Sequence, residues 1–153
     1  MQENISGFTG SFSKAGLAEG TNAATIKTAA PNGAGTDFAI NGIGYHKADT
    51  DNIATGSAAQ QAVSTSCLYL VQINAAGTIS IKKGTEQLTA DLGDNLSLQW
   101  PEPDADNCPI GGIKVATDAS TTFTLGTTDL GASGITDVYY DFLGGMPNAP
   151  QVS

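Results

Sequence analysis

The fold class is decided by residues 67–84, CLYLVQINAAGTISIKKG. Apolar side chains occupy nearly every position from Leu68 to Ile73, so both faces of a strand here are apolar. Residues 74–77, NAAG, have turn composition. Ile79 and Ile81 then alternate with polar residues. The stretch therefore predicts a β-hairpin with one buried strand and one half-exposed strand.

A second hairpin is predicted for residues 37–47, DFAINGIGYHK. Asn-Gly at positions 41–42 is the preferred two-residue hairpin turn, because both central residues need positive φ. This turn sets the register, so that Ile40 faces Ile43 and Phe38 faces Tyr45 on one side. Ala39, Gly44 and His46 then point to the other side.

The rest of the chain repeats short alternating segments separated by Gly, Pro and Asn turns. Strands are expected at 95–100, 110–117, 121–125 and 135–142. Residues 48–66 are expected to be a polar loop, either throughout or with one short helical turn at 57–63, where Ser57 and Gln60 have capping-box spacing. The expected fold is all-β: an antiparallel β-sandwich or jelly-roll-like barrel.

The chain divides into three expected parts. Residues 1–36 are rich in small residues and end in a Pro-Asn-Gly breaker, so we expect an extended N-terminal arm. Residues 37–146 form the β-sandwich core, and residues 147–153 form a C-terminal tail. The arm is either ordered by a neighbouring molecule or a loose tail. Its scattered apolar residues are candidates for partner binding: Ile5, Phe8, Phe12 and Leu17.

Charge excludes several functions. The net charge is −9, with six lysines and no arginine. Nucleic-acid binding requires a basic patch, and an anionic membrane surface is disfavoured by the same sign of charge. The first 20 residues lack the basic start and apolar run of a signal peptide, so we expect synthesis and assembly in a cytoplasm.

Two cysteines, Cys67 and Cys108, have two interpretations. They form a disulfide that closes a loop of about 40 residues, or they are separate buried thiols in a reducing compartment. The absence of an export signal favours free thiols.

Catalytic and metal chemistry have weak support. His46 is the single histidine and has no evident acid–base partner. Two acidic clusters, residues 49–52 and 104–107, have either Ca²⁺-binding or ordinary turn composition. Trp100 with Tyr139 and Tyr140 could stack on a sugar or belong to the core. We expect no enzyme activity, no cofactor and no metal.

Four segments together resemble a module of tailed-phage structural proteins, namely head-decoration and fibre-associated virion proteins. They are GIGYHKADTDNIA (42–54), CLYLVQINAAGTISIKKGTE (67–86), CPIGGIKVATDASTTFTLGTTDL (108–130) and GITDVYYDF (134–142). The resemblance covers most of residues 38–143 and includes no catalytic motif.

The resemblance implies a non-enzymatic virion protein. The first expectation is a capsid decoration or cement protein, a homotrimer on the outer head surface that binds the major capsid protein and stabilises the capsid. The alternative is a tail or head fibre domain that recognises a host-surface glycan.

Overall fold

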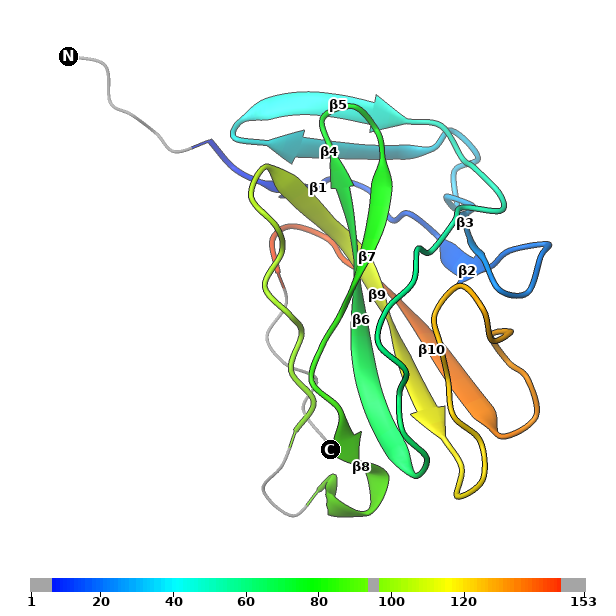
Figure 1. The fold of residues 1–153 in the computed structure, drawn as a ribbon. Coiled ribbons are helices and arrows are strands. Elements are labelled where there is room, and N and C mark those ends of the chain that lie inside the picture. The colour runs from blue at the N-terminus through cyan, green and yellow to red at the C-terminus, as the bar shows by residue number, and fades with distance from the viewer. Residues whose placement is uncertain (1–6, 94–96, 147–153) are drawn as a thin grey trace.

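The computed structural model describes residues 7–93 and 97–146, and it is essentially all-β with antiparallel sheets (Figure 1). The predicted fold class is thereby confirmed. One short 3₁₀ turn, η1, interrupts the strands at Thr89–Asp91. The strands are β1 (Gly10–Ser11), β2 (Leu17–Glu19), β3 (Ile26–Thr28), β4 (Thr36–Ile40), β5 (Ile43–Lys47), β6 (Thr65–Asn74), β7 (Ile79–Lys83), β8 (Gln87–Leu88), β9 (Asn107–Thr117) and β10 (Ile135–Asp141).

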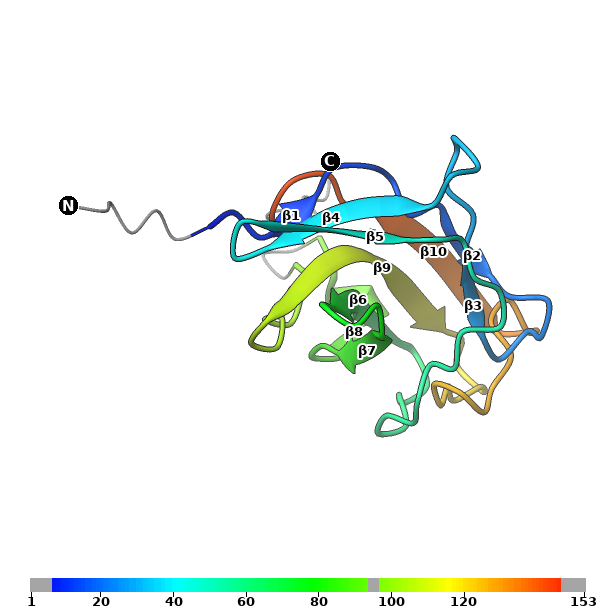
Figure 2. The same ribbon diagram turned by 90° about the horizontal axis from the view of Figure 1, so that it is seen from above.

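The strands form two sheets and a separate pair. The larger sheet has the order β10-β9-β6-β7, with β8 paired to the beginning of β6. The smaller sheet has the order β1-β4-β5, and β2 pairs with β3. Figure 2 shows the smaller sheet as a layer over the β9 side of the larger one. In Figure 1 the β4–β5 hairpin runs across one end of β6 and β9.

Both predicted hairpins are confirmed. β6 and β7 are joined by a turn in which the Gly77 N–H donates to the Asn74 carbonyl at 2.9 Å. β4 and β5 have the predicted register, with Ile40 opposite Ile43 and Phe38 opposite Tyr45. The Phe38 and Tyr45 rings stack at 5.6 Å between centroids.

A β-bulge in β9 explains why Ile110 and Ile113 both reach the core although they are three residues apart. Register with β6 shifts between Val71 and Gln72, so that Ile110 is the extra residue. Gly111 follows with no side chain. A Cβ there would lie 2.4 Å from Leu17 Cδ1, so the missing side chain gives Leu17 its place.

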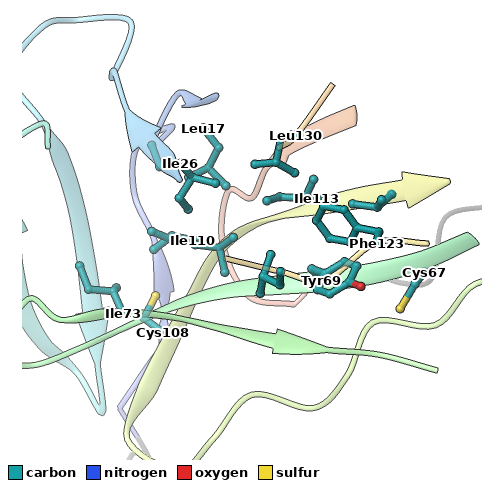
Figure 3. Close-up of a cluster of buried hydrophobic side chains, with 14 of the residues drawn as sticks. Leu17, Ile26, Cys67, Tyr69, Ile73, Cys108, Ile110, Ile113, Phe123 and Leu130 are labelled. Atoms are coloured by element: carbon teal, nitrogen blue, oxygen red, sulfur yellow. The ribbon is translucent and has the colours of Figure 1, made fainter. Parts of the chain in front are cut away.

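The main core lies on the bulged face of the larger sheet (Figure 3). β6 is its centre, because nine of its ten residues are buried. Side chains from the smaller sheet, from the β2–β3 pair and from the 121–132 loop close this face. The buried cluster includes Leu17, Ile26, Phe38, Tyr69, Ile73, Ile110, Ile113, Phe123 and Leu130.

The opposite face of the sheet is covered by an extended segment, residues 97–103, where the sequence predicted a strand at 95–100. Residues 97–100 are not a strand, while residues 95 and 96 lie outside the described part of the chain. Proline at 101 and 103 removes two backbone donors that a sheet would need. Trp100 instead packs edge-on against Tyr140 and Phe142.

One other local prediction needs correction, and one open alternative is decided. Residues 121–125 form only an isolated bridge between Phe123 and Gln61, although Phe123 and Leu125 point inward as predicted. Residues 57–63 contain no helix, so the loop is the alternative that the structure confirms. What the sequence did not indicate is that Gln61 in this loop is fully buried.

The last predicted strand is observed as β10, and side chains on both of its faces pack against other parts of the protein. Tyr140 and Phe142 pack with Trp100 on the outer face, as their predicted shared face requires, but Val138 on that face is 43% exposed. Ile135 is buried in the main core, and Tyr139 packs against it.

The prediction that residues 1–36 form an arm outside the core is wrong for the described part from β1 onward. Leu17 and Ile26 are 7% and 0% exposed and belong to the main core. β1 pairs with β4, within the predicted core region. The core domain therefore begins well before residue 37. Residues 1–6 and 147–153 lie outside the described residues.

Candidate interaction surface

Two exposed phenylalanines flank β1. Phe8 and Phe12 are 46% and 61% exposed, and their rings stack with 5.6 Å between centroids and 29° between planes. Gly10 lies between them in the chain. A Cβ at Gly10 would meet Phe8 Cζ and the Gly144 oxygen, each at 2.4 Å. Glycine at this position therefore lets the Phe8 ring fold back along the strand.

One more exposed apolar residue comes to β1 from a distant part of the sequence. Ser11 and Gly144 exchange backbone hydrogen bonds of 3.0 and 2.8 Å, which brings in Leu143, 58% exposed. We call Phe8, Phe12 and Leu143 the β1 apolar group. Ile43 is also exposed, but it pairs with Ile40 and so lies on the other face of the smaller sheet from Gly10 and the Phe8 ring.

The predicted partner-binding residues separate into three cases. Phe8 and Phe12 are exposed and lie together. Leu17 is buried over Gly111, so it is not part of any surface. Ile5 lies outside the described residues. Sequence reasoning missed Leu143, because its proximity to β1 depends on the long-range pairing of Ser11 with Gly144.

This concentration is notable because large exposed apolar residues are few. The described residues have seven of them, and three belong to the β1 apolar group. The other four are Ile43, Val63, Leu88 and Val138. Apolar residues gathered on a surface mark interaction sites more often than single scattered ones do.

The predicted acidic clusters hold the chain together. The Asp49 carboxylate accepts the Ala30 N–H at 2.9 Å, and Asp51 accepts the Thr21 N–H and hydroxyl at 3.0 and 2.5 Å. These bonds tie the β2–β3 region to the 49–52 loop. The Thr21 hydroxyl is the main reason that the pKa of Asp51 lies below its usual value.

The second cluster acts in the same way. Asp104 pairs with Lys82 at 2.8 Å and accepts the Gln72 amide at 2.6 Å, while its own N–H donates to Gln72 at 2.8 Å. Asp106 accepts the Asn41 side-chain amide at 3.0 Å. Among the described residues, no group of three or more metal-ligating side chains comes together.

The histidine and the two cysteines, the remaining candidates for catalytic residues, lie in surroundings that are typical of structural residues. His46 Nδ1 lies 2.7 Å from Asp37 Oδ1, and both side chains are about half exposed. Cys67 and Cys108 are free and buried, and burial raises their pKa values to about 11 and about 12. Cys67 pairs with Val115 and Cys108 with Ile73, six residues further along β6. That spacing is about 20 Å, too far for a disulfide.

One hollow on the described surface is a candidate for a small-molecule site. This shallow hollow of about 240 Å³ lies between the end of β5, the 50–54 loop and the β6–β7 turn. Lys47, Ile53 and Thr78 line it. This volume is below the range of about 300–1,000 Å³ that is usual for small-molecule sites. Trp100 is occupied by edge contacts to Tyr140 and Phe142, and a Cβ at Gly112 would lie 2.1 Å from its ring.

The comparisons with known proteins found no relative. No family model, no curated protein and no solved structure matches this chain. Within residues 7–93 and 97–146, no helix is long and apolar enough to cross a membrane.

Proposed function

We propose that this chain is a non-enzymatic structural protein of a tailed-phage virion, a decoration protein on the outer surface of the capsid. The observation that carries the proposal is the β1 apolar group, in which a stacked Phe8–Phe12 pair is exposed on the surface of the β-domain. Burying exposed aromatic rings in a partner's pocket is the usual source of binding energy at a protein interface.

Three further features support a structural role. The resemblance of residues 38–143 is to virion proteins. Charged residues make up only 14% of the chain, and a weakly charged surface suits close packing against a shell. Many copies on one particle would make attachment tight even if each contact is modest. The partner is the major capsid protein, and the copies associate in a small symmetric oligomer, for which the resemblance alone implies a homotrimer.

Heads that lack the protein provide the test. The double variant Phe8→Ser/Phe12→Ser and the control double variant Leu88→Ser/Val138→Ser each replace two exposed apolar residues. We expect the Phe8/Phe12 variant to co-sediment with such heads at least about tenfold more weakly than wild type. The control should bind like wild type. Equal binding by both variants would contradict attachment through the β1 apolar group.

A companion measurement tests the role itself. Heads without the protein should release DNA at a lower temperature, or after milder osmotic shock, than complete heads. If the heads are equally stable but the phage fails to adsorb to its host, host-surface recognition replaces capsid stabilisation as the function.

A further inference from the structure

One edge of the smaller sheet is open. β5 is the last strand in the order β1-β4-β5, and no described strand pairs with its other side. β5 lies at the outer end of the molecule in Figure 1. Open edges present unpaired N–H and C=O groups and pair readily with another strand. β5 contains neither proline nor a bulge, two of the usual protections of an edge, and its one lysine, Lys47, is at the end of the strand.

Hairpin geometry identifies which backbone groups point outward. In a hairpin with a two-residue turn, the residues that flank the turn exchange hydrogen bonds, and bonding then alternates along the strands. Ile43, Tyr45 and Lys47 thus bond to β4. Gly44 and His46 turn their N–H and C=O groups to the open edge, and these groups have no partner among the described residues.

We infer that β5 pairs antiparallel with β5 of a second copy of this chain, about a two-fold axis through Tyr45. In this register, the numbers of two residues that face each other across the two strands add up to 90. Gly44 faces His46 of the second copy and His46 faces its Gly44, so the four outward backbone groups on each strand are matched. The two three-stranded sheets become one sheet of six strands.

Side chains in this register are complementary. A Cβ at Gly44 would have no neighbour within 4 Å, which leaves room for the imidazole of the second copy. Tyr45 lies opposite Tyr45 of the second copy. Ile43, 60% exposed in the single chain, lies beside Lys47 of the second copy, whose alkyl stem can cover it. No like charges face each other directly.

The neighbouring turn also permits a close approach. The β6–β7 turn extends to the level of β5 in Figure 1, and its tip carries the small residues Ala75, Ala76 and Gly77. The pairing does not depend on the virion proposal. It predicts a dimer of the free chain, whereas the resemblance implies a trimer.

Sedimentation equilibrium over a roughly hundredfold range of concentration tests the pairing. Wild type should follow a monomer–dimer equilibrium. Gly44→Pro removes an outward N–H and leaves the β4–β5 hydrogen bonds in place, so it should abolish the dimer while circular dichroism and the Tm show that the fold remains. A wild-type trimer, or a wild-type monomer throughout, would overturn the inference without touching the capsid proposal.

A charge pair at position 43 tests the register. Ile43→Glu places a carboxylate beside Lys47 of the second copy, and Ile43→Lys places a second cation there. The Kd of Ile43→Lys should exceed that of Ile43→Glu by about threefold or more at low salt. Net charge alone predicts the reverse order, since the chain is already at −9. Equal Kd values, or the reverse order, would refute this register.

Discussion

At the residue scale, glycines determine where the large side chains go. Gly112 in β9 has no Cβ, and a Cβ there would lie 2.1 Å from Cζ3 of the Trp100 ring, so glycine at this position lets the indole approach the outer face of the sheet. Gly111 does the same for Leu17 on the inner face. Two consecutive glycines thus admit one large side chain on each side of the same strand.

Gly112→Ala should therefore displace Trp100 and lower the free energy of unfolding by about 1–3 kcal/mol. Gly44→Ala is the matched control, because Gly44 is also a strand glycine but has open space around it in the single chain. Both variants are measured at a concentration low enough to keep the chain monomeric. The control should change stability by less than about 1 kcal/mol. Urea denaturation followed by tryptophan fluorescence measures both. Similar losses from the two variants would mean that the Trp100 contact is not the cause.

Asp51 offers a pH-dependent test. Its pKa is lowered in the folded protein, chiefly by the Thr21 hydroxyl and then by the Thr21 N–H. A carboxyl whose folded pKa lies below its unfolded pKa stabilises the protein above the unfolded value, and this stability is lost as pH falls through the folded value. Thr21→Val removes the hydroxyl and keeps the N–H.

Titration by NMR should show a higher pKa for Asp51 in Thr21→Val than in wild type. The stability difference between the two proteins should also shrink as pH falls below the ordinary aspartate value of 3.8. An unchanged Asp51 pKa in the variant would show that the hydroxyl does not stabilise the carboxylate.

At the element scale, the two hairpins were predictable from the sequence, whereas the loop segments that pack over the two faces of the larger sheet were not. Asn41-Gly42 fixes a turn and a register by local backbone chemistry, and the alternation in β6 and β7 is equally local. The segments around Gln61 and Trp100 have no such local turn or alternation signal. Their conformation depends on how their side chains pack against the larger sheet. The Ile110–Gly-Gly–Ile113 spacing was the one readable sign of the bulge.

Gln61 shows how such a segment is held. Its side chain accepts the Tyr69 hydroxyl at 3.0 Å and donates to the carbonyls of Val115 and Thr65 at 3.0 and 3.2 Å, all within the core. Gln61→Leu should lower the free energy of unfolding by about 3 kcal/mol, because it leaves the buried hydroxyl without its acceptor.

A double-mutant cycle with Tyr69→Phe isolates that bond. The double variant Gln61→Leu/Tyr69→Phe should cost less than the sum of the two single changes, since it leaves no orphaned hydroxyl. Additive costs, measured by chemical denaturation, would mean that the Gln61–Tyr69 bond contributes nothing of its own.

At the scale of the whole molecule, residues 10–36 and the later strands form one core. The β1 apolar group depends on this, since it joins strands from both ends of the described chain. Composition suggested an arm because Leu17 and Ile26 are isolated among small residues. Isolated apolar residues suffice when partners such as Gly111 are supplied by a distant strand, which local sequence does not reveal.

Truncation tests this integration. A chain that begins at residue 37 loses β1, β2 and β3 together with Leu17 and Ile26, so it should fail to fold cooperatively. A chain that begins at residue 7 keeps all of these and should unfold with a Tm close to that of the full chain. Thermal unfolding followed by circular dichroism measures both. A cooperative transition in the chain that begins at residue 37 would contradict a shared core.

The central claim, that the protein decorates a phage capsid, is tested most directly by its copy number on purified heads and on separated tails. Quantitative mass spectrometry of the two fractions gives that number relative to the major capsid protein. The account predicts hundreds of copies on each head and none on the tail. Tens of copies confined to the tail fraction, or absence from the particle, would contradict it.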